Sequence, residues 1–200
     1  MPDTGAPWNI PYVESTDLVS DWPTDSLALA NAIDAGLDAA GGLVAVKHAL
    51  FTGTQSASVT AGSNVAVTDL SITHTLADAG NKLIVSAYLG TVATSLQRAE
   101  AVLLVFDGST SIGAGDVDGS RFSGISGGRA SPTGDNRQTQ SLSGMFVYSP
   151  GDTNAHTYTV RVGNLQVATQ TLWINRNEND SNAIVEPRAS SALVIQEVKV

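Results

Sequence analysis

The sequence contains no cysteine and carries little charge. Without cysteine, no disulfide can brace the fold and no thiolate can act as a metal ligand or nucleophile. Charged residues make up 14% of the 200 residues, well below the roughly 25% that is typical of soluble proteins. We therefore expect much of the surface to face other copies of the chain or other proteins.

The few charges are mostly negative. The formal net charge is −9 and the isoelectric point lies near 4.5, which opposes broad contact with phosphate backbones or anionic bilayers. No apolar stretch approaches the roughly 18 residues that span a membrane, and the N-terminus has neither the positive charge nor the apolar core of a secretory signal. We expect no nucleic-acid partner, no membrane insertion and no cofactor.

Residues 1–22 form a proline-punctuated segment that is rich in aromatic side chains. Such a segment cannot form a core by itself, and its large apolar side chains need a surface to pack against. We predict an extended attachment segment with four anchor residues, since buried aromatics tend to dominate interface energy: Trp8, Tyr12, Leu18 and Trp22. The alternative is that these residues pack within the same trimer, including under the chain's own β-domain.

Residues 23–42 have the punctuation of one short helix, with Pro23 in the first turn and Gly41-Gly42 as the stop. Leu29, Ile33 and Leu37 recur at helical spacing and form a narrow apolar stripe. Because so short a helix is marginal in water, we expect the stripe to pack against the same helix of neighbouring copies. Folding back onto the chain's own β-domain is the alternative.

Residues 43–200 change to a period of two, which predicts a mainly β domain. Eight segments are strand candidates: 43–50, 64–73, 82–89, 99–106, 144–148, 156–162, 171–175 and 192–198. Eight such segments with irregular loops and no second helix predict an antiparallel jelly-roll sandwich.

A glycine-rich stretch at 108–143 interrupts this pattern and is predicted to be a long loop without regular structure. It carries Arg121, Arg129 and Arg137 at eight-residue intervals in an otherwise acidic chain. Their guanidinium groups suit contact with an anionic glycan or with acidic groups of a neighbouring subunit. The alternative is that they only keep the loop soluble.

One catalytic motif occurs within this loop. Gly124-Ile125-Ser126-Gly127-Gly128 matches the G-x-S-x-G pattern, and Asp152 and His156 follow in the order that some hydrolases use. The flanks lack the apolar strand and the helix that such a serine requires. Ser126 is therefore interpreted as a loop residue, with a small glycan esterase as a remote alternative, and no catalytic residue is predicted.

Two patterns for metal binding are also incomplete. Asp116-Val117-Asp118 resembles the start of a calcium loop, but Arg121 and Gly127 stand where glycine and glutamate are required. The histidines His48, His74 and His156 are far apart in sequence and lack a metal-ligand spacing, although strand histidines could meet at a symmetry axis. No metal site is predicted.

The arrangement of these parts suggests a family. Residues 11–19 (PYVESTDLV) and 29–37 (LANAIDAGL) resemble the N-terminal attachment segment of many bacteriophage fibre and minor virion proteins. Residues 146–150 (FVYSP), 158–162 (YTVRV) and 189–198 (ASSALVIQEV) resemble the small β-domains at the ends of such fibres, which are similar to trimeric complement-C1q and tumour-necrosis-factor jelly rolls.

The resemblance implies a homotrimeric virion protein without enzymatic activity. It would be a short fibre or spike that attaches to tail or capsid through residues 1–22 and displays its β-domain to a host-surface glycan or protein. A capsid decoration protein that stabilises the head without binding a receptor is the alternative. Either protein would be made in the host cytoplasm and assembled into the particle.

Overall fold

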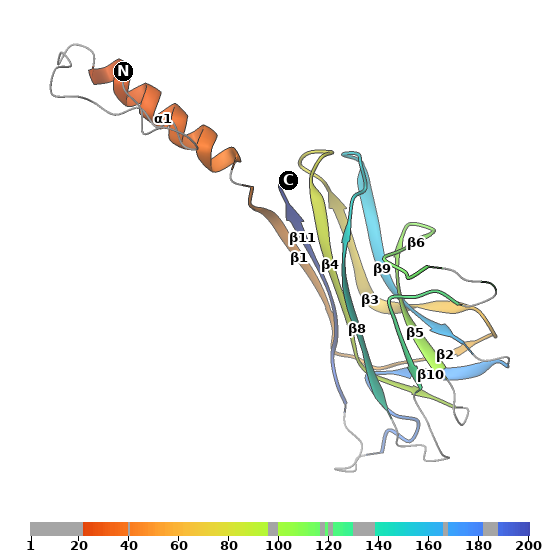
Figure 1. Ribbon diagram of the computed structural model, residues 1–200. Helices are drawn as coiled ribbons and strands as arrows, with labels where there is room; N and C mark the ends of the chain where they lie inside the picture. The colour runs from red at the N-terminus through yellow and green to blue at the C-terminus, as the bar shows by residue number, and fades with distance from the viewer. Residues whose placement is uncertain are drawn as a thin grey trace. The chain divides into compact units, whose positions relative to one another are not determined.

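The computed structural model describes residues 22–39, 41–95, 100–116, 119, 122–129, 139–165, 168–181 and 188–200 (Figure 1). The chain divides into two compact units, one made of residues 1–42 with 199–200 and the other of residues 43–198. In the first unit, α1 spans Trp22–Ala39. Leu27 and Ile33 of α1 are 62% and 44% exposed, so this helix presents apolar side chains to solvent.

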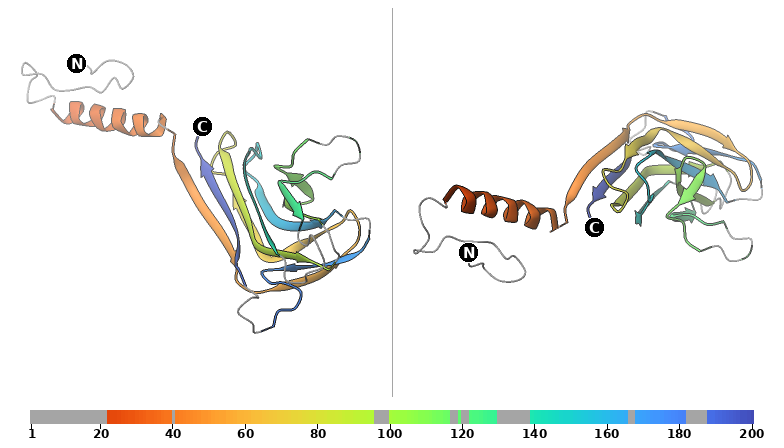
Figure 2. Two further views of the ribbon diagram at one scale, coloured as in Figure 1. Left: turned by 60° about the horizontal axis from the view of Figure 1, so that its bottom comes forward. Right: turned by 90° about the horizontal axis from the view of Figure 1, so that it is seen from above.

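The second unit is a sandwich of two antiparallel sheets (Figures 1 and 2). The first sheet has the order β1-β11-β4-β10-β2, with β8 on the other side of β4. Its strands are β1 (Leu43–Phe51), β2 (Gln55–Val59), β4 (Lys82–Thr94), β8 (Gln140–Tyr148), β10 (Gln170–Ile174) and β11 (Ser191–Val198). The second sheet has the order β3-β9-β5-β6, with β7 also paired to β5. Its strands are β3 (Asn64–Thr75), β5 (Glu100–Asp107), β6 (Thr110–Ile112), β7 (Ser126–Arg129) and β9 (Ala155–Asn164).

This topology is that of a jelly roll. The short pairs β1/β2, β6/β7 and β10/β11 each occupy the place of one long strand, which leaves eight positions along the chain. When these eight positions are numbered in chain order, the first sheet has the order 1-8-3-6 and the second has the order 2-7-4-5. This is the order produced by two Greek keys. The predicted mainly β, antiparallel jelly-roll fold is confirmed, and each of the eight predicted strand segments forms a strand.

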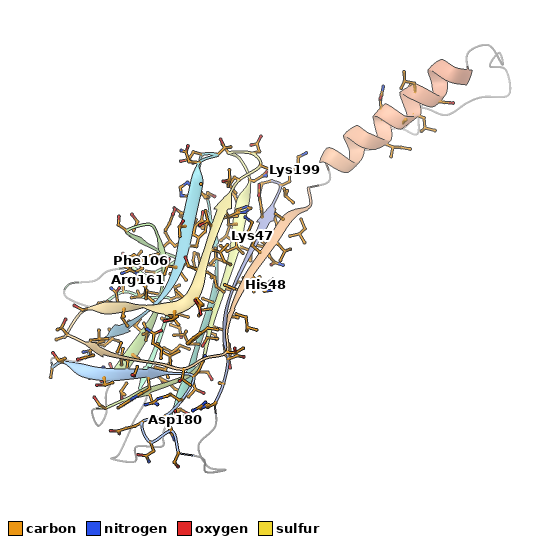
Figure 3. All side chains as sticks on the ribbon, turned by 180° about the vertical axis from the view of Figure 1, so that it is seen from behind. Lys47, His48, Phe106, Arg161, Asp180 and Lys199 are labelled. Atoms are coloured by element: carbon orange, nitrogen blue, oxygen red, sulfur yellow. The ribbon has the colours of Figure 1, made fainter. Side chains whose placement is uncertain are left out.

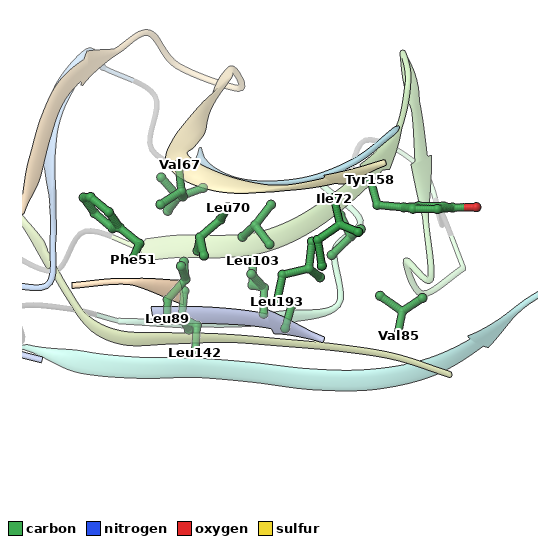
Figure 4. Packing of buried hydrophobic residues seen from close by; sticks show 14 of the residues in the cluster. Phe51, Val67, Leu70, Ile72, Val85, Leu89, Leu103, Leu142, Tyr158 and Leu193 are labelled. Carbon is green, nitrogen blue, oxygen red and sulfur yellow. The ribbon is translucent and has the colours of Figure 1, made fainter. Parts of the chain in front are cut away.

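The core lies between the inner faces of the two sheets (Figure 4). Alternation along each strand supplies it: in β11, Leu193 and Ile195 are buried, whereas their neighbours are half-buried. The second sheet contributes Val67, Leu70, Ile72, Leu103 and Tyr158, which meet Val85, Leu89, Leu142 and Leu193 of the first sheet.

The glycine-rich stretch differs from its prediction. The segment 108–143 was predicted to lack regular structure, but it contains β6, β7 and the first residues of β8. Residues 122–129 lie alongside β5, where the amide of Ile125 donates a 2.9 Å hydrogen bond to the carbonyl of Leu103. Backbone pairing of this kind does not require an apolar run, so glycine-rich residues can form it without a hydrophobic signal.

Candidate functional site

The outward side of the first sheet is built from three rows of side chains that cross β1, β11, β4 and β8. Residues directly opposite each other in an antiparallel pair share a face, so the register defines these rows. They are Val46-Gln196-Ile84-Val147, His48-Val194-Ser86-Met145 and Leu50-Ala192-Tyr88-Ser143. We call these twelve residues the outer apolar face.

The outer apolar face contains neither a carboxylate nor a lysine or arginine. Its most exposed large apolar members are Met145 (71%), Val147 (64%), Leu50 (58%) and Val46 (51%). Three rows on four strands cover about 20 Å by 20 Å, and seven of the twelve side chains are apolar. The largest apolar patch of a soluble protein is often functional. The face is therefore the strongest candidate for a functional surface among the described residues.

The second sheet has a different outward side, because the chain covers its apolar part itself. Val102 and Leu104 of β5 point outward yet are only 3% and 2% exposed. A Cβ added to Gly163 would lie 2.7 Å from Cγ1 of Val102 and 3.5 Å from Cε1 of Phe122, so these three residues are in close proximity. The segment with Phe122 and Gly124 thus shields this part of β5 from solvent.

The remaining outward side of the second sheet is polar. Hydroxyl groups pair across β3 and β9, with Thr73 Oγ1 2.9 Å from Thr157 Oγ1 and Ser71 Oγ 3.2 Å from Thr159 Oγ1. Arg161 of β9 lies over the ring of Phe106, 4.5 Å from its centroid (Figure 3). The two outward sides therefore differ: one is hydroxyl-rich or covered, and the other combines seven apolar with five polar side chains, which are exposed or half-buried among the described residues.

A second cluster lies where β5 ends and β9 begins. His156 Nδ1 is 2.7 Å from Asp107 Oδ2, and its Nε2 is 3.0 Å from Asp152 Oδ1. Ionised carboxylates only accept hydrogen bonds, so both ring nitrogens must donate and the ring is an imidazolium. The hydrogen bond to Asp152 raises the pKa of His156, burial opposes this shift, and Asp107 adds to it. Tyr148 Oη donates a further 3.0 Å hydrogen bond to Asp107.

The three residues of the remote esterase alternative, Ser126, Asp152 and His156, are only partly brought together. Asp152 and His156 are in contact, but Ser126 is in strand β7, paired with Leu103 on the side of β5 opposite to β9. Leu103 is four residues from Asp107 along β5, a separation of about 13 Å. Ser126 therefore occupies a strand rather than a strained turn, and it is remote from the imidazole.

The three histidines occupy separate environments. His48 lies on the outer apolar face, while His74 and His156 are cross-strand partners in the second sheet. His74 bonds to buried Glu197. Within the described part of the chain, no three acidic or histidine side chains are placed to hold a metal ion. Asp116 of the calcium-like sequence is exposed, and Asp118 lies outside the described residues.

Most other predicted site residues cannot be placed. Trp8, Tyr12, Leu18, Arg121 and Arg137 lie outside the described residues, as do the side chains of Trp22, Leu37 and Arg129. Trp22 is the first residue of α1, so its backbone is helical rather than extended. Leu29 is half-buried and Ile33 is exposed. Their predicted packing against neighbouring helices stays a prediction.

The outer apolar face was not predicted, although its signal is present in the sequence. Strands that are apolar on both sides produce continuous apolar runs instead of alternation. Such runs occur at 43–46 (LVAV), 83–85 (LIV) and 192–195 (ALVI), and also in β5 at 101–106 (AVLLVF). The chain covers both sides of β5 by itself, whereas in β1 and β11 the second apolar side stays exposed or half-buried.

Comparison with known proteins adds little. No protein-family model matches the sequence, and no curated protein sequence does. The fold is similar to a chain in the structure of the infectious bursal disease virus Gx strain, with a TM-score of 0.34 and 11% identity. The match covers 78% of this chain and 39% of that one. A likeness of this degree does not assign a function. Among the described helical residues, no segment is long and apolar enough to cross a membrane.

Proposed function

We propose that this chain is a structural protein of a virus particle, assembled as a homotrimer whose jelly-roll domains pack through the outer apolar face. The observation that carries the proposal is the outer apolar face, whose twelve residues include no carboxylate, lysine or arginine and are exposed or half-buried among the described residues. Burying apolar area stabilises an assembly by roughly 25 cal/mol per Å², and this face would require no charged side chain to lose its water. The sequence resemblance to trimeric fibre-end domains supports the same reading.

The contrast between the outward sides of the two sheets supports the proposal that the exposed apolar side chains of the first sheet are covered by other copies of the chain. The chain shields Val102 and Leu104 with its own residues, Phe122 among them, whereas the described residues leave apolar side chains of the first sheet exposed. Homo-oligomer interfaces are more apolar than other protein surfaces, and identical copies offer identical apolar faces at equal concentration. We therefore propose that a second and a third copy of the chain cover the outer apolar face.

In this arrangement the other sheet would remain accessible. The segment around Phe122 and the hydroxyl pairs of β3 and β9 lie on the second sheet, on the side of the sandwich away from the outer apolar face. A trimer would present three copies of these surfaces, and several weak contacts from one rigid body give useful avidity. Host-surface adhesion through this side, with Arg121, Arg129 and Arg137 nearby in sequence, forms part of the proposal. No catalytic step does.

Attachment to the particle is assigned to residues 1–22 on sequence grounds. The exposed Leu27 and Ile33 of α1 offer a second apolar contact between copies. The proposed protein thus has an anchoring end, a short helical connection and a displayed β-domain, and it attaches to tail or capsid.

Sedimentation of the full-length chain tests the self-association. We expect a trimer for the native sequence and a folded monomer for Val194→Asp, which places a charge in the middle row of the face. Thr73→Asp on the hydroxyl-rich side is the matched control and should leave the trimer intact. A native chain that stays monomeric at all concentrations would overturn the proposal.

A second experiment tests the location. Purified particles from infected cells should contain the chain, and labelled antibody in electron micrographs should mark either the tail or the head. Head labelling together with unchanged host adsorption after deletion of the gene would favour the capsid decoration protein. Absence of the chain from particles would exclude both virion roles.

A further inference from the structure

One end of the sandwich interior is ionisable rather than apolar. At this end, the inward-facing residues closest to the strand ends are His74 of β3, Asp107 of β5, Tyr148 of β8, His156 of β9 and Glu197 of β11. Two hydrogen bonds cross from sheet to sheet in this layer, His74 to Glu197 at 2.8 Å and Tyr148 to Asp107 at 3.0 Å. The sheets are therefore joined here by contacts whose strength depends on protonation.

Glu197 is the most confined member of this layer. It is the only buried acidic side chain among the described residues, at 1% exposure. Its Oε2 contacts Nε2 of His74, and its Oε1 accepts hydrogen bonds from the amide of Ala77 at 2.8 Å and from Nδ2 of Asn81 at 2.6 Å. All three donors belong to β3 or to the turn that follows it, so one ionised carboxylate fastens the end of β11 to residues 74–81.

The surroundings of His74 make this link sensitive to the charge on Glu197. Nδ1 of His74 is buried and has no hydrogen-bond partner within the described part of the chain. His156 lies directly opposite His74 on β9, and its imidazolium is held by Asp107 and Asp152. Cross-strand partners have Cβ atoms about 5 Å apart. A proton on Glu197 would therefore leave the ring of His74 beside a positive charge and without a carboxylate of its own.

The ionisable groups of the neighbouring elements are engaged elsewhere. On β1, Nζ of Lys47 donates a 2.9 Å hydrogen bond to the carbonyl of Thr73. In the turn after β3, Asp78 accepts a hydrogen bond from the amide of Gly80. On β4, Lys82 precedes the inward-facing Leu83 and so points outward. Tyr148 of β8 and Tyr158 of β9 pack edge to face. The contacts of Glu197 itself thus determine how this link responds to acid.

The end of β11 also holds the start of β1. Glu197 and Val198 pair with Ala45 and Leu43, and the amide of Lys199 donates a 2.9 Å hydrogen bond to the carbonyl of Gly42. Residues 42–45 follow α1 in the sequence. Any loosening of the β11 end therefore also loosens the segment of chain that leads from α1 into the β-domain.

We propose that Glu197 and His74 form a proton-operated latch: when Glu197 takes up a proton, the end of β11 and the turn at 76–81 open locally, while the rest of the sandwich stays folded. The adjoining inward residues of β11, Leu193 and Ile195, are buried and apolar and do not titrate. Opening releases residues 42–45 as well, so the connection to α1 gains freedom in acid. The latch does not require the self-association proposed above.

The pKa of Glu197 supports the direction of this response. Burial raises it, but hydrogen bonds from Asn81, Ala77 and His74 outweigh burial and hold the pKa below the ordinary 4.5. Opening breaks these hydrogen bonds, so the pKa returns toward 4.5 and the open form takes up a proton more readily than the closed form. Acid therefore shifts the equilibrium toward the open form.

Amide hydrogen exchange of the native full-length chain tests the latch without any substitution. Exchange is read by mass spectrometry at pH 7 and pH 3 and corrected for the intrinsic rate at each pH. We expect protection at 43–46, 76–81 and 195–198 to fall roughly three- to tenfold in acid. Protection in β5 and β9 should change less than in these three segments.

Two variants assign the response to the carboxylate. Glu197→Gln should exchange at pH 7 as the native segments do at pH 3, and its protection should no longer depend on pH. Asn81→Ala removes one donor to the carboxylate and should open the same segments at pH 7 to a smaller extent. Asp78→Asn is the control, because its amide oxygen can still accept from Gly80, and it should keep the native response.

Three outcomes would overturn the latch. Protection that falls equally in every strand at pH 3 would mean global rather than local opening. Unchanged protection at 195–198 in acid would mean that the link does not respond to protons. A native pH response in Glu197→Gln would assign the opening to a different carboxylate.

Discussion

Nε2 of His74 lies 2.8 Å from Oε2 of Glu197, and both side chains are buried. The other carboxylate oxygen accepts hydrogen bonds from the amide of Ala77 at 2.8 Å and from Nδ2 of Asn81 at 2.6 Å. This carboxylate therefore joins the end of β11 to the residues that follow β3. Because the joined segments are more than a hundred residues apart, the contact ties the C-terminal strand into the sandwich.

Acid should weaken this link. Burial raises the pKa of Glu197, but hydrogen bonds from Asn81, Ala77 and His74 outweigh it and hold the pKa below its ordinary value of 4.5. A lowered folded-state pKa stabilises the fold above the unfolded-state value, and this stabilisation is lost as the pH falls through the folded-state pKa. We expect the free energy of unfolding, measured in urea, to fall steadily below about pH 4.5.

Replacement of the carboxylate provides the matching control. Glu197→Gln should lower stability by about 1–3 kcal/mol at pH 6, because the hydrogen bonds from Ala77, Asn81 and His74 would no longer end on a charged carboxylate. Its stability should also depend less on pH between 3 and 5. An acid limb identical to that of the native chain would show that other carboxylates cause the loss.

The imidazolium of His156 should produce the opposite dependence. Its hydrogen bond to Asp152 raises the pKa of His156 above the ordinary 6.5, with burial opposing and Asp107 adding to the shift. Stabilisation by a raised pKa is complete below the unfolded-state value and is lost as the pH rises through the folded-state value. We expect stability to decline above neutral pH in the native chain, and to a smaller extent in His156→Gln.

Nuclear magnetic resonance can follow this titration directly. The chain has three histidines, and loss of one ring signal in His156→Gln identifies its resonance. That resonance should titrate above pH 6.5 in the native chain. A midpoint below 6.5 would contradict the bridging imidazolium.

Gly144 should tolerate no side chain. It is paired with Ala87 in β8, and a Cβ at this position would overlap Cγ2 of Ile125, a residue packed against the core. We expect Gly144→Ala to lower the free energy of unfolding by about 1–3 kcal/mol, the usual cost of overpacking. Gly115→Ala is the control, because nothing lies within 4 Å of its added Cβ. Equal melting temperatures for the two variants would contradict the packing.

Phe122 should contribute stability although it belongs to a loop. Its ring lies beside Gly163, next to Val102 and Leu104, and it is 38% exposed. We expect Phe122→Ala to lower stability by about 1–2 kcal/mol through lost apolar burial. The variant should also bind more of a dye that reports exposed apolar surface. Unchanged stability and dye binding would mean that other residues provide the cover.

The strands that sequence analysis missed share a common cause. β2 (QSASV) is short and has only Ala57 and Val59 as apolar residues, β7 (SGGR) has no large apolar residue, and β6 is only three residues long. Their backbone pairing with β10 and β5 places them in the sheets. A hydrophobic pattern cannot reveal a strand whose stability comes from hydrogen bonds to a neighbour distant in sequence.

The candidate surface was missed for a related reason. Val46 and Leu50, on either side of His48, fit an ordinary β-strand pattern, whereas the apolar stripe of α1 predicts trimer contacts in the helix. Sequence alone does not say which side of β1 faces the core, because that depends on its register with β11. The helical stripe and the sheet face are separate predictions, and the variants above distinguish them.

The sequence by itself determined the class of the fold, since alternation and apolar runs are local patterns that each strand carries within itself. Tertiary structure alone decided which apolar runs are covered. β5 is shielded on both sides by residues such as Phe122, whereas the outward side of β1 stays exposed among the described residues. It also brought Asp107 to His156, 49 residues away. Which apolar side chains are covered, and which distant residues meet, depends on strand register and on the crossovers between distant segments. Register and crossovers are set by the packing of the whole sandwich, not by any one segment of the sequence.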